Sequence, residues 1–328
     1  MPNFDNRNLR QEAANKLRTA PNRGKLILLF AGVSAGLSLA AGIVSVILDS
    51  QIAGTGGLSG LQLRSTLSTV QAMLNILIMA FIPFWNLGYT SVVLKLGRGE
   101  AAKETDLLNG LRRFGPVLRL MLLRLAVSFI VGFAAVQVAS IAFSMTPWAV
   151  PFYQQLENAG LMSPSGMMDE ATMSVLLPTM IPLWILTAAL LVAAMIPVSY
   201  RLRLAELCLM DDPQCGALLA MFQSNRMMKG NCLALFKLDL HFWWYYLAQI
   251  LVTALCYGDV LLPLLGIQLP FSPEVGFLLF YVLAQGAQIL LYWRCRNLVE
   301  CTYVGAYDLL RTTPAPQPQP PKNVPWNY

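Results

Sequence analysis

The chain has 328 residues, of which 56% are hydrophobic and 12% are charged, and its formal net charge is +6. Soluble domains carry about a quarter charged residues, so this composition excludes an ordinary water-soluble domain. The basic residues are spread over the gaps between apolar segments instead of forming one basic patch, which argues against nucleic acid as a partner.

The N-terminal segment, residues 1–25, is basic and amphipathic. It is too polar to span a membrane, and we expect it to lie along the inner leaflet with its apolar face toward lipid. The alternative is a cytoplasmic helix packed on the membrane domain. Two later segments have the same character. Their apolar residues are Leu107, Leu108, Leu111 and Phe114 in one, and Cys215, Leu218, Leu219 and Phe222, after an expected N-cap at Asp212-Pro213, in the other.

Six stretches of the chain are long and apolar enough to cross a bilayer, which needs about 20 residues of helix. In chain order these spans are 26–48, 67–94, 117–145, 173–199, 240–264 and 275–293. Within a bilayer, backbone polar groups have to be satisfied inside helices. The sequence therefore predicts an all-α fold in which residues 26–310 form an integral membrane bundle of six transmembrane helices, arranged as three hairpins with short amphipathic interface helices.

Lysine and arginine residues gather in alternate gaps between the six spans. Basic loops stay in the cytoplasm, so both termini are predicted to be cytoplasmic. Every hairpin then enters the membrane from the same side, which predicts parallel repeats. After the last span, the Pro-rich tail of residues 311–328 is expected to be disordered.

Two opposite charges occupy equivalent positions if the hairpins are repeats. Arg124 lies nine residues after Gly115, and Asp239 lies nine residues after Gly230. Charges at membrane depth rarely stay unpaired, so one interpretation is an Arg124–Asp239 ion pair that joins two hairpins. The alternative is that each side chain reaches the inner surface separately.

The deeper polar side chains are amides, among them Asn86, Gln249 and Gln285. Hydrogen bonding between helices is their default explanation, and they could also line a substrate path. The Gly32-xxx-Gly36 pattern in the first span permits a close contact with another helix.

Near the inner surface, four basic residues are candidate contacts for anionic lipid: Arg112, Arg113, Arg226 and Lys229. The sequence shows no nucleophile–base pairing, metal-ligand cluster or phosphate-binding loop, and its only histidine is His241. We therefore expect no enzyme activity, no metal and no cofactor.

Several short motifs carry a family resemblance. The most specific are Asp212-Pro213, Gly216-Ala217-Leu218, Met228-Lys229-Gly230-Asn231, Arg98-Gly99-Glu100 and Leu87-Gly88-Tyr89. With them, most of residues 9–310 resembles a bacterial family of polytopic membrane proteins, domain-of-unknown-function family 975. The chain departs from the family at Leu238-Asp239-Leu240-His241-Phe242, where members usually read Leu-Ser-Phe. The resemblance implies a multi-pass protein of the bacterial plasma membrane and carries no activity.

Little of the chain lies outside the predicted spans, and the interface segments are basic. These features favour a non-catalytic scaffold or accessory subunit that contacts other membrane proteins, or a second copy of itself, through its cytoplasmic face. One alternative is a transporter or exporter of a small amphipathic molecule or peptide. Another is a membrane protein that handles anionic lipid.

Overall fold

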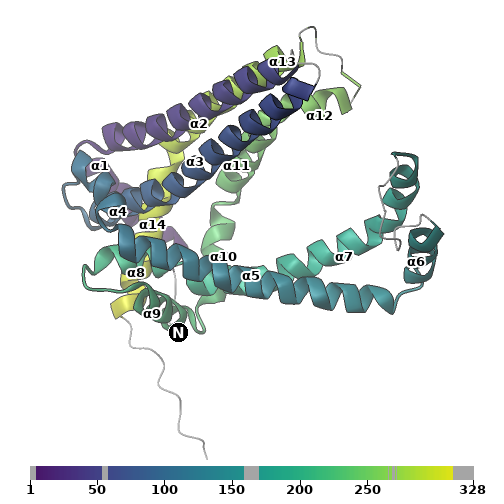
Figure 1. Cartoon of the computed structure of the whole chain (residues 1–328). Coiled ribbons are helices and arrows are strands. Elements are labelled where there is room, and N and C mark those ends of the chain that lie inside the picture. The colour runs from purple at the N-terminus through teal and green to yellow at the C-terminus, as the bar shows by residue number, and fades with distance from the viewer. Residues whose placement is uncertain are drawn as a thin grey trace, which may run out of the picture. The chain divides into compact units, whose positions relative to one another are not determined.

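The computed structural model describes residues 5–53, 58–158, 170–264 and 272–312, together with residues 266, 267 and 270. All regular structure in this part of the chain is helical, which confirms the predicted all-α class (Figure 1). Residues 313–328, most of the predicted Pro-rich tail, lie outside the described residues. The helices are α1 (Asn6–Thr19), α2 (Arg23–Ala53), α3 (Leu58–Arg98), η1 (Glu104–Leu108), α4 (Asn109–Arg112), α5 (Phe114–Ser144), α6 (Ala149–Asn158), α7 (Glu170–Leu202), α8 (Ala205–Asp211), α9 (Ala217–Met228), α10 (Cys232–His241), α11 (Trp243–Cys256), α12 (Gly258–Leu264), α13 (Pro273–Leu291), η2 (Tyr292–Arg296) and α14 (Asn297–Thr312).

Among the described residues, five helical segments are long and apolar enough to cross a membrane, and each overlaps a predicted span. They are Arg23–Leu48, Ser65–Arg98, Phe114–Ser144, Met180–Asp211 and Val275–Thr312. The remaining predicted span, 240–264, is divided among the end of α10, α11, which has 14 residues, and the shorter α12. A helix of that length is shorter than the roughly 20 residues that a bilayer requires. A membrane crossing by residues 240–264, and with it the arrangement of six spans as three hairpins, therefore stays a prediction.

The chain divides into two compact units, one formed by residues 1–118 and 204–328 and the other by residues 119–203. In the first unit, α2 packs against α3 and α13, and α13 packs against α11 (Figure 1). The amphipathic α1 and the C-terminal α14 pack on each other and on α3. Helices of the first and third predicted hairpins thus share one unit.

The second amphipathic segment packs against the backbone of α3. A Cβ atom added at Gly88 would lie 1.8 Å from the Leu107 carbonyl oxygen, and one at Gly110 would lie 1.9 Å from the Phe84 carbonyl oxygen. Only glycine permits this approach, because a side chain at either position would collide with a backbone that cannot turn away. Leu107 is fully buried by the contact, whereas Phe114 stays more than half exposed. This second amphipathic segment therefore packs on the helix bundle, which was the alternative to a position along the inner leaflet.

In the second unit, α5 and α7 meet near Gly132, where an added Cβ would lie 3.6 Å from Leu191 Cδ1. Phe143 of α5 is buried with Ala149 and Phe152 of α6. Beyond Arg124, α5 carries no charged residue and exposes many apolar side chains, which is typical of a helix that faces lipid. Its exposed apolar side chains include Leu125, Phe129, Ile130 and Phe133.

One local prediction is wrong, and a permitted helix contact is not made within the described chain. Asp212 does not cap a helix: α9 begins at Ala217 with Gly216 as its N-cap, and the Asp212 carboxylate instead accepts a hydrogen bond from the Gln214 amide at 2.9 Å. The Gly32-xxx-Gly36 pattern marks no close contact within the described chain, because no atom lies within 4 Å of a Cβ added at either glycine.

Candidate functional site

A cavity of about 480 Å³ lies inside the first unit, between α2, α3, α11, α13 and η2. This volume is in the range of small-molecule binding sites, which combine apolar walls with a few convergent polar groups. Both kinds of side chain line it. The apolar and aromatic ones include Phe30, Ile82, Val252, Phe277, Tyr281 and Tyr292, and the polar ones include Ser34, Asn86, Gln249, Gln285, Gln288 and Arg296.

The structure brings three of the predicted polar residues, Asn86, Gln249 and Gln285, to this one cavity. Gln249 of α11 and Gln288 of α13 exchange two hydrogen bonds, of 2.9 Å and 3.2 Å, through their side-chain amides. Such a pair satisfies one donor and one acceptor on each side chain and ties the two helices together. Its remaining hydrogen-bonding capacity, and that of Gln285, is available at the cavity wall.

The strongest charge at the cavity belongs to Arg296, which sequence reasoning missed. Its guanidinium carbon lies 4.3 Å from the ring centre of Tyr292, 4.6 Å from that of Phe30 and 4.8 Å from that of Tyr89. Aromatic faces attract a cation, most strongly where water is excluded. The Arg296 side chain is only 14% exposed, so these three rings hold a desolvated guanidinium.

Arg296 ends η2, a single turn of π-helix between α13 and α14. Turns of this kind inside α-helices are frequent at functional sites, because they re-aim side chains. Here the helix continues from the apolar α13 into the more polar α14, so Arg296 looks in the sequence like one more flanking basic residue. The signal that could have found it is an arginine four residues after a tyrosine at the end of an apolar helix.

Hydrogen bonds fix the aromatic wall beside Arg296. Trp85 Nε1 donates to the Phe30 carbonyl at 3.1 Å, and Tyr89 Oη donates to Asn297 Oδ1 at 2.6 Å. The rings of Phe30 and Tyr89 are stacked with their centres 4.4 Å apart. Side chains held in this way form a preorganised surface that does not have to be ordered when a ligand binds.

The predicted Arg124–Asp239 ion pair stays a prediction, because the two residues belong to different units. Asp239 accepts hydrogen bonds from two tyrosines, Tyr246 at 3.1 Å and Tyr303. The tyrosines come from α11 and α14, so the carboxylate joins these helices to the end of α10.

Of the four predicted lipid contacts, Arg112, Arg226 and Lys229 are exposed. Arg113 contacts protein: its guanidinium donates to the carbonyls of Asp212 and Pro213, both at 3.0 Å, and to that of Leu209. These carbonyls lie in the last turn of α8 and just after it, where a positive charge is favourable.

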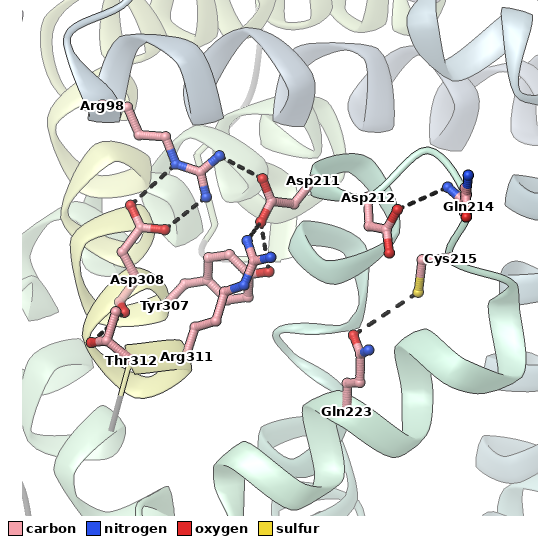
Figure 2. Close-up of polar contacts among 10 residues, drawn as sticks. All are labelled: Arg98, Asp211, Asp212, Gln214, Cys215, Gln223, Tyr307, Asp308, Arg311 and Thr312. Atoms are coloured by element: carbon pink, nitrogen blue, oxygen red, sulfur yellow. Dashed lines mark hydrogen bonds and ion pairs between the residues drawn. The ribbon is translucent and has the colours of Figure 1, made fainter. Parts of the chain in front are cut away.

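A second polar cluster joins α3, α8 and α14 away from the cavity lining (Figure 2). Arg98 donates through Nη2 and Nε to both carboxylate oxygens of Asp308, at 2.7 Å and 3.3 Å, and through Nη1 to Asp211 at 2.5 Å. Asp211 also accepts from Tyr307 at 3.0 Å and from Arg311. The Asp211 side chain is only 6% exposed. Arg98, the first residue of the Arg98-Gly99-Glu100 motif, is therefore paired with two carboxylates where α3 ends.

No group of three His, Cys, Asp or Glu side chains that could hold a metal occurs among the residues that the structure describes. Next to the polar cluster, burial raises the pKa of the Cys215 thiol above its usual range. The thiol therefore stays protonated at neutral pH, and its sulfur lies 4.0 Å from Gln223 Oε1 (Figure 2).

The fold and the cavity together define an all-helical protein with several helices of membrane-spanning length and a half-open, partly polar cavity between five of its helical segments. The chain belongs to the family described as Protein of unknown function (DUF975), whose sequence model matches residues 1–298. No curated protein and no solved structure matches the chain.

Proposed function

We propose that this protein is a non-catalytic, multi-pass protein of the bacterial plasma membrane that binds a small amphipathic molecule in the cavity of its first unit, as a transporter or exporter. The observation that carries the proposal is the cavity itself, which has aromatic and aliphatic walls, amide groups and one buried cation. A scaffold, which the sequence alone favours, needs no such space.

The arrangement of the lining supports an elongated ligand. Phe277 and Arg296 lie on consecutive helical segments nineteen positions apart, which corresponds to roughly 28 Å of helical rise. Along the helix that contains α13 and η2, the lining runs from Phe277 and Tyr281 through Gln285 and Gln288 to Arg296. An amphipathic molecule matches such a gradient, because its chain and its polar head require different surroundings.

A cavity-filling variant tests the proposal. Ala35 of α2 lines the cavity and is buried, whereas Ala40 on the same helix is exposed. The probe is dansylundecanoic acid, whose fluorescence reports transfer from water to an apolar site, added to purified protein in nanodiscs. We expect Ala35→Phe to weaken binding at least tenfold and Ala40→Phe to leave it unchanged. Equal binding by all three proteins would contradict the proposal.

A second proposal concerns α9, whose apolar side chains Leu218, Leu219 and Phe222 are 58%, 49% and 69% exposed. We propose that this face lies on the inner leaflet and that Arg226 and Lys229 contact anionic headgroups. Replacing both basic residues with glutamate is expected to reduce the anionic phospholipid that copurifies with the protein. Unchanged lipid content, measured by mass spectrometry, would refute this contact.

A further inference from the structure

We infer that the cavity selects an anionic amphiphile, a single alkyl chain with a carboxylate or phosphate head, and that Arg296 binds the head. The inference rests on the proposed function and adds the chemical class of the ligand. It depends on how the guanidinium is held.

The guanidinium has five N–H donors, and the described chain engages few of them. Nη2 donates to Asn86 Oδ1 at the long distance of 3.4 Å. Nε is buried and has no hydrogen-bond partner among the described residues. A buried donor without a partner is costly, and native proteins keep such groups where a ligand, ion or water completes them.

One carboxylate, Glu300, forms a long ion pair with Arg296 but does not accept a hydrogen bond from Nε. Glu300 lies four residues after Arg296, with its Oε1 atom 3.9 Å from Nε, which is beyond hydrogen-bond distance. The Glu300 side chain is 41% exposed, so water shares its charge. The rings of Phe30, Tyr89 and Tyr292 hold the cation but accept no conventional hydrogen bond from it.

An oxyanion fits the unused donors. Arginine presents its N–H groups in a planar fork that matches a carboxylate or phosphate with two parallel hydrogen bonds. On α13 the lining continues from Arg296 through Gln288, Gln285 and Tyr281 to Phe277, so a chain attached to the bound head could follow this helix from its amides to its aromatic rings.

The test compares ligands that differ only in the head or only in the chain. Displacement of the dansyl probe from protein in nanodiscs is measured with dodecanoate, dodecyl phosphate, dodecan-1-ol and inorganic phosphate. We expect the two anionic amphiphiles to compete about tenfold or more better than dodecanol, as a charge-assisted pair of hydrogen bonds implies. Inorganic phosphate should not compete.

Two variants assign the preference to Arg296. Arg296→Gln should bind dodecanoate and dodecanol alike, and Arg296→Lys, which keeps the charge without the planar fork, should retain part of the preference. Size-exclusion profiles check that both variants fold. If Arg296→Gln does not fold, the comparison of Arg296→Lys with the wild type tests the assignment.

The possible failures are distinguishable. If dodecanol and dodecanoate compete equally in the wild type, the cavity binds amphiphiles, and only the inference about the anion is overturned. If inorganic phosphate competes as well as dodecyl phosphate, the site binds small anions and the inference is likewise wrong. If none of the amphiphiles competes, the proposed function fails together with the inference.

Discussion

Charged side chains in the first unit are held by several partners at once. Asp211 accepts from Arg98, Tyr307 and Arg311, and Arg296 is held by three rings and Asn86. Removing a charge from water is costly, and the cost is recovered only when hydrogen bonds and opposite charges surround it. These residues therefore carry the most informative substitutions.

Asp211→Asn is expected to destabilise the protein by about 1.5–3 kcal/mol, because it weakens hydrogen bonds to two arginines at a site that is almost fully buried. The matched control is Glu12→Gln, which removes an exposed i,i+4 pair with Lys16 and should cost at most about 0.5 kcal/mol. Thermal unfolding in detergent, followed by tryptophan fluorescence, measures both. Equal effects would show that the cluster in Figure 2 contributes nothing beyond a surface pair.

Asp106 predicts a pH dependence. Burial raises the pKa of this carboxyl, but the Lys95 ammonium and the Lys103 amide, each 2.8 Å away, outweigh burial and hold the pKa below its usual value of 3.8. A carboxyl with a lowered pKa stabilises the folded state above its unfolded pKa, and this contribution is lost as the pH falls through the folded pKa. Asp106→Asn should therefore be less stable than the wild type at pH 6. The difference in melting temperature should shrink progressively as the pH falls below 3.8. A difference that stays constant across this range would contradict the role of Asp106.

At the scale of elements, glycines decide where helices end and how closely they approach. Gly99 and Gly230 have φ angles of +80° and +84°, where other residues are strained, and they follow α3 and α9. At Gly99 the Glu100 amide donates to the Lys95 carbonyl and the Gly99 amide to the Leu96 carbonyl, the pattern of a Schellman motif. Two of the motifs that carry the family resemblance, Arg98-Gly99-Glu100 and Met228-Lys229-Gly230-Asn231, are therefore helix ends.

Gly88→Ala tests the close approach of α3 to the segment that contains Leu107. The new methyl would overlap the Leu107 carbonyl oxygen, so the backbones must separate, at a cost of about 1–3 kcal/mol. Gly36→Ala on α2 is the control, because no atom lies within 4 Å of its added Cβ. Alanine there should leave stability unchanged or slightly higher. The melting temperatures of the two variants provide the comparison, and a Gly88→Ala variant as stable as Gly36→Ala would refute the contact.

Helices were predictable from the sequence because apolar runs and helix-ending glycines are local signals. Packing was not. Gly32 and Gly36 have the spacing of a helix contact, but a Cβ added at either has no atom within 4 Å, whereas one added at Gly42 would lie only 2.8 Å from Tyr281 Cε1. The sequence does not say which side of an apolar helix meets protein and which meets lipid, since both surroundings select the same residues.

At the scale of the whole molecule, the candidate site was predicted in part. Polar residues stand out in apolar helices, so Asn86, Gln249 and Gln285 could be named in advance. The cavity that they share depends on how α2, α3, α11 and α13 pack, which no local pattern encodes. Arg296 was not predicted as a site residue because it follows an apolar run. An arginine in that position usually sets the orientation of a membrane span.

The membrane topology remains a prediction from charge, and reporter fusions test it. Alkaline phosphatase fused after Lys103 or Lys229 should be inactive, because these positions are predicted to be cytoplasmic, and a fusion within residues 159–169 should be active. Green fluorescent protein at the same sites should show the opposite pattern. Active phosphatase after Lys229 would overturn the cytoplasmic placement of the basic segments.

Photo-crosslinking tests the central claim most directly. A dodecanoate analogue with a diazirine on its chain is bound to the protein in nanodiscs and irradiated, and the labelled peptides are identified by mass spectrometry. The account predicts adducts on cavity residues of α13 and α11, such as Tyr281 and Val252, that excess unlabelled dodecanoate removes and that Ala35→Phe abolishes. Adducts confined to exposed side chains such as Phe129 and Phe133, insensitive to competitor, would show that the amphiphile meets the protein only as surrounding lipid.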